Sequence, residues 1–382
     1  LFTDLREFDC TKILLKNGEE VCREAADVKA APGETVTISL FDLSSDLFKE
    51  DKEYSVIVSF TLREDTDWAE SGYEIAFGQT VLDIGSKKAG IDMLLNRIEK
   101  PARKLEIIDC DYNYTFKGEN FEYIFSKRMG GFLSMRVNGR EMFDMAPKPN
   151  FWRAPTDNDM GNRMVLNMGQ WELSSRYNAV VDFKAEGNKV TFTYLLGGHK
   201  DVFMQTSYTV SDDGSVRITM DLPAIPNGQD IPVFGMMFTL PADYGNVRYY
   251  GEGPDECMLD RRAGAKLGLY GFKASENFTP YLMPQECGNR TGVRMAEVTD
   301  ERGHGLLLAS ENMELSVLPF TPFEIENARH IHELPDIHYT IVRANFIQMG
   351  VGGDDSWGAP VHEQYLVKTD KPMHFEFVIA GI

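Results

Sequence analysis

The sequence predicts an all-β protein. Apolar and polar residues alternate, as in half-buried strands, far more often than they follow helical spacing. A hairpin pattern also occurs in residues 204–222, where two alternating runs meet at Asp212, Asp213 and Gly214, residues that suit a tight turn. Four segments show the alternation clearly: TVTISLFDL, YSVIVSFTL, KVTFTYLLG and SVRITMDLP.

The strand-like segments divide into two groups. Residues 1–100 hold several short strands over a length that is typical of an immunoglobulin-like β-sandwich. The segment GSKKAGIDMLLNRIEKPARK, residues 85–104, breaks the strand pattern and is predicted to be the boundary. Residues 105–382 contain strands and loops without a second linker and are predicted to form one larger domain. The chain opens with leucine inside a strand-like pattern, so we expect it to be part of a longer protein.

Helical patterns are few and short. TPFEIENARHIHEL, residues 321–334, is the main candidate, and Pro335 would end such a helix because proline cannot continue the hydrogen-bond ladder.

Charge and cysteine content limit the partners and the compartment. The chain has 39 basic and 59 acidic residues, a net charge of −20, which repels phosphate backbones and anionic lipid. Nucleic acid and membrane surfaces are therefore not expected as partners. There is no apolar run of membrane-spanning length and no leader, and the five scattered cysteines include no CxxC pair. We expect a reducing, cytoplasmic location.

The histidines of HIHELPDIH raise the question of a metal site. His330, His332 and His338 lie close together, but a zincin needs HExxH on one helix face. Here Pro335 interrupts the segment and Asp336 stands where the second histidine should be. Histidines around a helix end are the favoured interpretation, and no metal ligand is predicted.

Two acidic pairs are candidates for catalytic carboxylates, which glycoside hydrolysis uses on either side of the scissile bond. Asp354 and Asp355 are adjacent in QMGVGGDDSWG, so they would point to opposite sides of an extended chain. Asp157 and Asp159 in APTDNDMG could share a side, but Asp near glycine also stabilises turns. Structural roles are favoured for both pairs.

Tryptophans in irregular loops suggest sugar contacts. Trp152 and Trp357 lie in loops that contain proline or glycine. An exposed indole could stack on the apolar face of a sugar, whereas a buried one would close the loop onto the core. Both interpretations stay open from the residues alone.

Four long, irregular segments carry a family resemblance. NFWRAPTDNDMG, YYGEGPDECMLDRRAGAKLGLY, PQECGNRTGVR and QMGVGGDDSWG resemble, in this order and spacing, the carboxyl-terminal region of the LacZ-type β-galactosidases of glycoside hydrolase family 2. The resemblance is strong from about residue 105 onward and weaker before it. It implies an immunoglobulin-like sandwich followed by a β-supersandwich similar in fold to galactose mutarotase.

The resemblance also implies where the chemistry lies. The catalytic glutamates of the family belong to a TIM barrel that precedes these two domains, so no catalytic residue is expected in this chain. Mg and Na ions are used at that barrel site and no cofactor is expected here. The implied partners are a β-galactoside, the barrel portion and, for the whole enzyme, further copies of itself.

Site residues are carried over by their match to the motifs. The tryptophan of the GGDDSW loop, here Trp357, contacts the sugar in the family, and Gly161, Asn162 and Arg163 correspond to a loop that borders the same mouth. Asp354 and Asp355 are expected to fix the loop through backbone hydrogen bonds.

The resulting expectation is the carboxyl-terminal portion of a retaining β-galactosidase that acts on terminal β-D-galactosides such as lactose and is inactive by itself. A natural small subunit with a separate large chain is one alternative. A free-standing carbohydrate-binding or mutarotase-like protein is another.

Overall fold

The computed structural model describes residues 3–85, 88–101 and 103–382. Antiparallel strands dominate the described residues, and the predicted all-β class is confirmed. The protein divides into two compact units, Leu1–Ala89 with Lys266–Leu269, and Gly90–Ala265 with Tyr270–Ile382. The chain thus passes between the units inside the segment 85–104, of which residues 86, 87 and 102 lie outside the described part.

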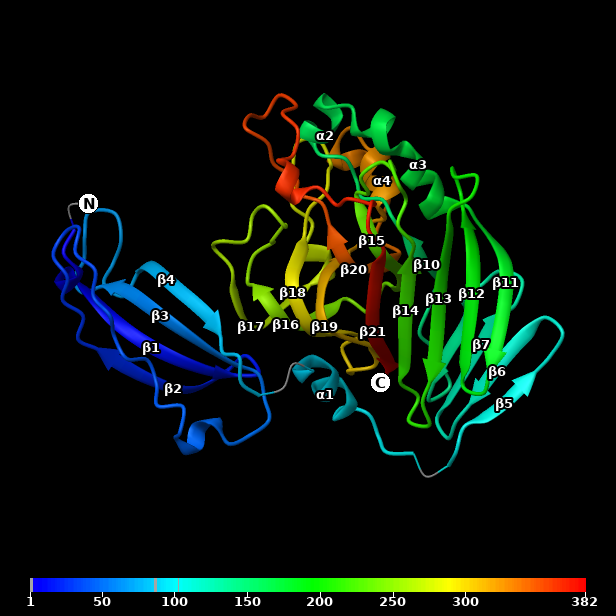
Figure 1. Ribbon diagram of the computed structural model, residues 1–382, viewed down its shortest axis with the longest axis horizontal. Helices are drawn as coiled ribbons and strands as arrows, with labels where there is room; N and C mark the ends of the chain where they lie inside the picture. Colours follow the sequence, from blue (N-terminus) through cyan, green and yellow to red (C-terminus); the bar gives the residue numbers. More distant parts are fainter. Residues whose placement is uncertain (1–2, 86–87, 102) are drawn as a thin grey trace. The chain divides into compact units, whose positions relative to one another are not determined.

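The first unit is built on one four-stranded antiparallel sheet in the order β2-β1-β3-β4 (Figure 1, blue). Asn17 and Gly18 both have positive φ, which lets β1 and β2 join through a tight turn. The predicted strand YSVIVSFTL is β3 from end to end. The strands are β1 (Phe8–Lys16), β2 (Glu19–Ala26), β3 (Tyr54–Leu62) and β4 (Glu74–Val81), with short 3-10 turns η1 (Leu5–Glu7) and η2 (Asp46–Phe48).

A loop rather than a strand covers one face of this sheet. Leu14, Tyr54 and Val56 form a buried cluster against which Leu40 and Phe41 pack. These two residues belong to TVTISLFDL, which was predicted as a strand and has no strand assignment, so that prediction is wrong. Alternation of apolar and polar residues indicates that one side of a segment is buried. A strand also needs a neighbouring strand with free backbone groups to which it can hydrogen-bond. The loop and the sheet together make the unit sandwich-like.

The second unit has two sheets. A five-stranded sheet runs in the order β5-β6-β7-β8-β9, and a twelve-stranded sheet follows the path β10-β15-β20-β19-β21-β14-β13-β12-β11, with β16, β17 and β18 branching from it. The strands of the smaller sheet are β5 (Glu106–Asp109), β6 (Asn113–Lys117), β7 (Phe121–Ser126), β8 (Phe132–Val137) and β9 (Arg140–Glu141). Those of the larger sheet are β10 (Met145–Asn150), β11 (Asn178–Glu186), β12 (Lys189–Leu196), β13 (Phe203–Val210), β14 (Val216–Leu222), β15 (Val233–Pro241), β16 (Asn246–Gly253), β17 (Lys266–Lys273), β18 (Asn289–Thr299), β19 (Gly305–Leu318), β20 (Tyr339–Gln348) and β21 (Met373–Gly381).

Two of the predicted strands and the predicted hairpin lie in the larger sheet. KVTFTYLLG forms β12, and SVRITMDLP forms β14. β13 and β14 pair antiparallel as predicted, and Gly214 takes φ +81 in the turn between them.

An aromatic core lies between the two sheets. Phe125 of β7 and Phe132 of β8 are buried, and both rings contact Tyr208 of β13 with centroid distances of 5.1 and 5.3 Å. Aromatic rings at such distances add to the free energy of burying their surface. The second unit is therefore a large β-sandwich, as predicted.

Three of the helices, α2 (Asp157–Gly161), α3 (Met164–Arg176) and α4 (Pro322–Asn327), gather at one end of the large sheet, together with the loop that follows β20 (Figure 1). The helix predicted over residues 321–334 is shorter than expected, because Ala328 and His330 are already extended. The longest helix, α3, was not predicted. It buries Trp171 but exposes Leu166, so its apolar residues do not all lie on one face, which is the pattern that identifies a helix in a sequence. The helices are α1 (Ala89–Leu95), α2 (Asp157–Gly161), α3 (Met164–Arg176) and α4 (Pro322–Asn327), with turns η3 (Ala274–Glu276), η4 (Ile331–Glu333) and η5 (Glu363–Tyr365).

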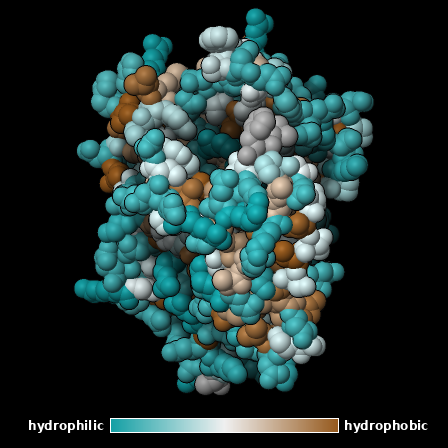
Figure 2. Space-filling view, turned by 90° about the vertical axis from the view of Figure 1, so that its left-hand side faces the viewer, coloured by the Kyte–Doolittle hydropathy of each residue, from teal (hydrophilic) through white to brown (hydrophobic). Residues whose placement is uncertain are grey.

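Hydrophilic side chains cover most of the face seen in Figure 2, with apolar side chains in small scattered groups. Among the described residues, no helix has the length and hydropathy needed to cross a membrane.

Candidate functional site

The site is built around the tryptophan loop, which we define as residues 349–360, between β20 and η5. Trp357 is 89% exposed on this loop. Trp152, by contrast, is fully buried, and its indole N–H donates to Glu326 Oε2 at 2.9 Å. The stacking interpretation is therefore wrong for Trp152, which closes its loop onto the core.

Two charged side chains, the half-buried Asp260 and the fully buried Arg153, fix the start of the tryptophan loop. Asp260 Oδ2 accepts the backbone N–H groups of Val351 at 2.9 Å and Gly352 at 2.7 Å. Arg153 donates to the Gly350 carbonyl at 3.0 Å. Hydrogen bonds with an ionised partner are about twice as strong as neutral ones, so these contacts define the path of the loop.

The two aspartates of the loop differ in their partners. Asp355 Oδ1 accepts the backbone N–H groups of Trp357 at 2.8 Å and Ala359 at 3.2 Å, the geometry expected of a residue that shapes the loop. Asp354 instead lies 2.7 Å from His362 Nε2 and is exposed. Backbone hydrogen bonding thus describes Asp355 but not Asp354.

Gly161 lies directly against the tryptophan loop. A Cβ added to Gly161 would stand 2.4 Å from the Gly358 Cα, and one added to Gly358 would stand 2.6 Å from the Gly161 Cα. Gly358 also has φ +105, which side chains rarely adopt. In addition, Asn158 Nδ2 donates to the Asp355 carbonyl at 2.8 Å. The structure therefore brings α2 and the Trp357 backbone together.

Asn162 and Arg163 continue from α2 toward α3. Asn162 is the C-cap of α2, and Arg163 is the N-cap of α3 with φ 66, an uncommon left-handed conformation for a residue with a side chain. Arg163 is exposed. The four residues that were predicted to border the sugar thus lie on neighbouring segments, and the side chains of Trp357 and Arg163 are both exposed.

A buried ion pair between Arg153 and Asp159 holds α2 in place. Arg153 Nη1 lies 2.8 Å from Asp159 Oδ2, and both side chains are fully buried. Asp159 also completes a capping box with Thr156 at the start of α2. Asp159 is therefore structural, as favoured from the sequence. The sequence did not predict that Arg153 and Asp260 hold the tryptophan loop, although both lie in the irregular motifs.

The histidines predicted to surround a helix end lie around η4. His338 Nδ1 contacts the Asp336 carbonyl at 2.8 Å, and the rings of His330 and His332 stack at 5.5 Å. Within residues 3–85, 88–101 and 103–382, no group of three or more His, Cys, Asp or Glu side chains has the geometry of a metal site.

Comparisons with known families match both units. Residues 117–379 match the family described as "Beta galactosidase small chain", and residues 1–83 match "Beta-galactosidase, domain 4".

Individual relatives give the same result. A β-galactosidase of Halalkalibacterium halodurans is 39% identical over the whole of this chain, which spans 38% of that relative. A β-galactosidase of Priestia megaterium is 36% identical, with 37% of its length spanned. A β-galactosidase small subunit of Latilactobacillus sakei is 32% identical and is 98% covered by 73% of this chain. The chain thus spans less than two fifths of the first two relatives.

Solved structures with similar arrangements include a putative aldose 1-epimerase of Escherichia coli K12, at 8% identity and a TM-score of 0.40 over 71% of this chain and 98% of that chain. A galactose mutarotase related enzyme of Lactobacillus acidophilus gives 8% identity and a TM-score of 0.38 over 71% and 97% of the respective chains.

The two family matches and the relatives agree on one assignment. The chain belongs to the β-galactosidases of glycoside hydrolase family 2 and corresponds to their carboxyl-terminal region, domain 4 followed by the small-chain domain.

Proposed function

We propose that this chain is the carboxyl-terminal portion of a retaining β-galactosidase that hydrolyses terminal β-D-galactosides such as lactose. In this proposal it supplies one wall of the substrate site rather than the catalytic groups. The observation that carries the proposal is the indole of Trp357, 89% exposed on a loop held by several backbone hydrogen bonds.

The chemistry of an indole fits such a wall. Its face can cover the C–H face of a sugar ring, which gives apolar contact and orientation without any proton transfer. Arg163 is exposed and Asn162 partly exposed beside the same loop, so both can donate hydrogen bonds to sugar hydroxyl groups.

The two catalytic carboxyl groups are proposed to lie on a TIM barrel outside this sequence, together with the Mg and Na ions that the family uses there. The aspartates of the tryptophan loop have other partners: His362 for Asp354, and backbone N–H groups for Asp355. Neither is therefore assigned an acid or base role.

The barrel can be supplied in two ways. It can precede this chain in one polypeptide, as the long β-galactosidase relatives suggest, or it can belong to a separate large subunit. The second arrangement is supported by the relative named as a small subunit, which this chain covers over 98% of its length. In both cases the partner of the tryptophan loop is the barrel portion of the same enzyme.

The test is Trp357→Ala in the complete enzyme. We expect the Michaelis constant to rise about ten- to a hundredfold, a loss of roughly 1–3 kcal/mol for one aromatic contact, with a smaller change in kcat. Because Trp357 is exposed, the melting temperature should stay unchanged. Trp357→Phe is the matched control and should recover most of the affinity. An unchanged Michaelis constant with a sharply lower melting temperature would contradict the proposal.

A further inference from the structure

Helix α3 carries apolar side chains on two opposite faces. Met164 and Trp171 are buried and stand seven residues apart, which places them on the same face. Leu166 and Leu173 are also seven residues apart, but they are 79% and 45% exposed. An offset of two residues turns the direction of a side chain by about 200° around a helix with 3.6 residues per turn. The second apolar pair therefore points away from the core.

One more residue extends this exposed row. Tyr177, the C-cap of α3, follows Leu173 by four residues and is 66% exposed. The charged side chains of α3, Glu172 and Arg176, pair with each other at 2.9 Å. We define the outer face of α3 as Leu166, Leu173 and Tyr177. Apolar and aromatic side chains without a charge among them are typical of the centre of a protein–protein interface.

Several contacts hold α3 firmly on the second unit. Ser175 Oγ accepts the Phe151 N–H at 2.8 Å, and Ser174 Oγ donates to the Gly197 carbonyl at 2.7 Å. A Cβ added to Gly197 would stand 2.1 Å from the Tyr177 carbonyl oxygen, so the turn after β12 packs directly against the end of the helix. The outer face is thus fixed in place, and a preorganised surface loses little conformational entropy on binding.

The outer face is unusual for a helix at a protein surface. Such a helix normally turns one apolar stripe to the core and a polar face to the solvent. Single exposed leucines are ordinary, but here three apolar side chains follow one another along one rigid helix. Contact with a second protein surface removes such a row from water, which is favourable.

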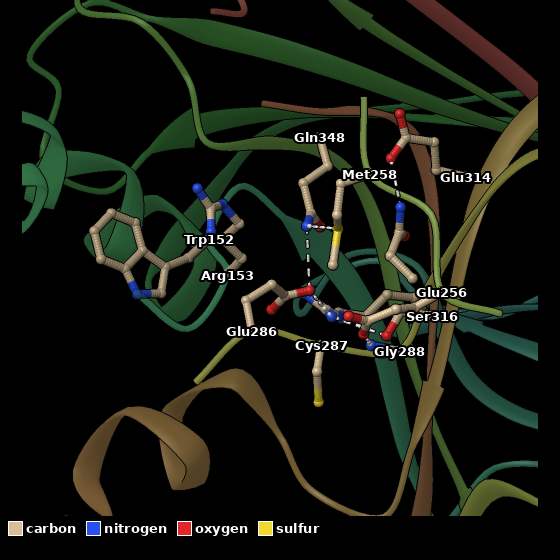
Figure 3. Close-up of polar contacts among 12 residues, drawn as sticks. Trp152, Arg153, Glu256, Met258, Glu286, Cys287, Gly288, Glu314, Ser316 and Gln348 are labelled. Atoms are coloured by element: carbon tan, nitrogen blue, oxygen red, sulfur yellow. Dashed lines mark hydrogen bonds and ion pairs between the residues drawn. The ribbon is translucent and has the colours of Figure 1, made fainter. Parts of the chain in front are cut away.

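The outer face lies at the same end of the large sheet as the tryptophan loop (Figure 1). Gly161 of α2 meets Gly358 of that loop, and α3 begins at Met164, directly after α2. The loop is fixed from inside as well, because Gln348 at the end of β20 donates to Glu286 Oε1 at 3.2 Å (Figure 3). A partner that contacts Trp357 therefore approaches the end of the sheet that carries α3.

A second copy of this chain is the less suitable occupant. Each copy has a net charge of −20, so two copies repel each other. A copy seated on α3 would also stand beside Trp357, where the proposed function requires the barrel portion. The barrel portion can cover the outer face and the tryptophan loop together.

We propose that the outer face of α3 is a docking surface for the barrel portion of the parent enzyme, with Leu166 and Leu173 as the central contacts and Tyr177 at the edge. This inference rests on the proposed function for the presence of a barrel portion. It does not depend on a sugar contact of Trp357. Docking at α3 fixes the distance between the barrel and the tryptophan loop, because both α3 and the loop are held on the same unit.

Cysteine footprinting of the 382-residue protein and of the complete enzyme tests this surface. We expect Leu166→Cys and Leu173→Cys to react with a maleimide roughly tenfold more slowly in the complete enzyme, because a thiol reacts only where the reagent reaches it. Leu133→Cys is the matched control, at a 50% exposed leucine of β8, and should react equally fast in both forms. Peptide mass spectrometry resolves the new thiol from the five native cysteines.

Photo-cross-linking then identifies what covers the face. p-Benzoylphenylalanine at position 166 of the complete enzyme should form cross-links to peptides of the barrel portion. Equal maleimide rates in the two forms overturn the proposal, and so do cross-links to a second copy of residues 1–382 in place of the barrel. Neither readout involves a substrate, so an unchanged Michaelis constant of Trp357→Ala would count against the sugar contact alone.

Discussion

At the scale of single residues, Arg153 connects the two segments of the candidate site. Its guanidinium contacts Asp159 of α2 and the carbonyl of Gly350 in the tryptophan loop, and it is completely buried. The pairing compensates the cost of burying each charge only while both partners are present. Arg153 is thus a positioning residue, since it holds the backbone on which Gly161 and Trp357 lie.

Arg153→Met should therefore destabilise the second unit strongly. Removal of the guanidinium leaves the Asp159 carboxylate buried without its ion-pair partner, which typically costs about 3–5 kcal/mol. Urea unfolding measures this loss. Arg217→Met is the matched control, because Arg217 pairs with Glu376 at the surface and such pairs contribute about 0–1 kcal/mol. Equal losses in the free energy of unfolding for the two variants would show that the buried Arg153 pair contributes no more to stability than a surface pair.

Glu314 should make stability depend on pH. Burial raises the pKa of this carboxyl group from 4.5 to about 7, although Asn289 Nδ2 donates to it at 2.8 Å. Since the folded pKa lies above the unfolded one, the stabilising contribution is present below pH 4.5 and is lost as the pH rises to 7. Glu314→Gln removes this dependence, so its stability relative to wild type should rise by roughly 1–3 kcal/mol between pH 5 and 8.

Urea unfolding at several pH values measures this difference. Glu311→Gln, at an exposed position of the same strand, is the control and should track the wild type. A constant difference between Glu314→Gln and wild type across pH 5 to 8 would contradict a titrating Glu314.

At the scale of elements, the close contact of α2 with the tryptophan loop depends on glycine. Gly161 and Gly358 approach each other so closely that a methyl group on either meets backbone atoms of the other. Asp260 and Asp355 then hold the rest of the loop through backbone N–H groups. The position of the indole is therefore set mainly by backbone contacts. A side-chain substitution elsewhere on the loop should displace the indole less than a substitution at Gly161 or Gly358.

Gly358→Ala should displace the loop. The variant combines a strained φ of +105 with a Cβ 2.6 Å from Gly161, and we expect a loss of about 1–3 kcal/mol and a higher Michaelis constant in the complete enzyme. Gly264→Ala is the control, because a Cβ there meets nothing within 4 Å and its φ is not positive. Steady-state kinetics and thermal unfolding of both variants measure the effect. Wild-type kinetics for Gly358→Ala would show that the loop accommodates the methyl group.

Strands were easier to predict from the sequence than loops and short helices. The strands β12 and β14 have one buried face, and burial on one side produces an alternation of apolar and polar residues that the local sequence displays. The segment 35–43 has the same alternation without a strand, because strand pairing depends on neighbours that the local sequence does not contain.

The candidate site was predicted mainly through the motif resemblance. Local composition described Trp152 and Trp357 alike, as tryptophans in irregular loops, yet one is fully buried and the other is 89% exposed. The supports of the loop, Arg153 and Asp260, act across about 197 and 91 residues of sequence, so their partners follow only from the tertiary fold. Physical reasoning on a local window cannot supply such contacts.

At the scale of the whole molecule, each unit has its own buried clusters, and the second has a continuous aromatic and aliphatic core between its two sheets. A domain with its own core can fold independently. The proposed chemistry, however, needs two carboxyl groups about 5 Å apart on either side of a glycosidic bond. Folding and activity should therefore separate when this chain is studied alone.

We accordingly expect the 382-residue protein to fold and yet not to hydrolyse a nitrophenyl β-galactoside. The two carboxylates of the tryptophan loop are held by other groups, Asp354 by His362 and Asp355 by backbone N–H groups, so neither is assigned the role of the nucleophile that forms a glycosyl-enzyme intermediate. A far-UV circular dichroism spectrum dominated by strand checks the fold in the same sample. Addition of the barrel portion, expressed separately, should restore turnover. When the same barrel portion is mixed with the Trp357→Ala variant of this chain, turnover should return with a higher Michaelis constant. Turnover by the 382-residue protein alone that survives repurification would place catalytic carboxylates within this chain, and the wall-forming role of the tryptophan loop would then have to be abandoned.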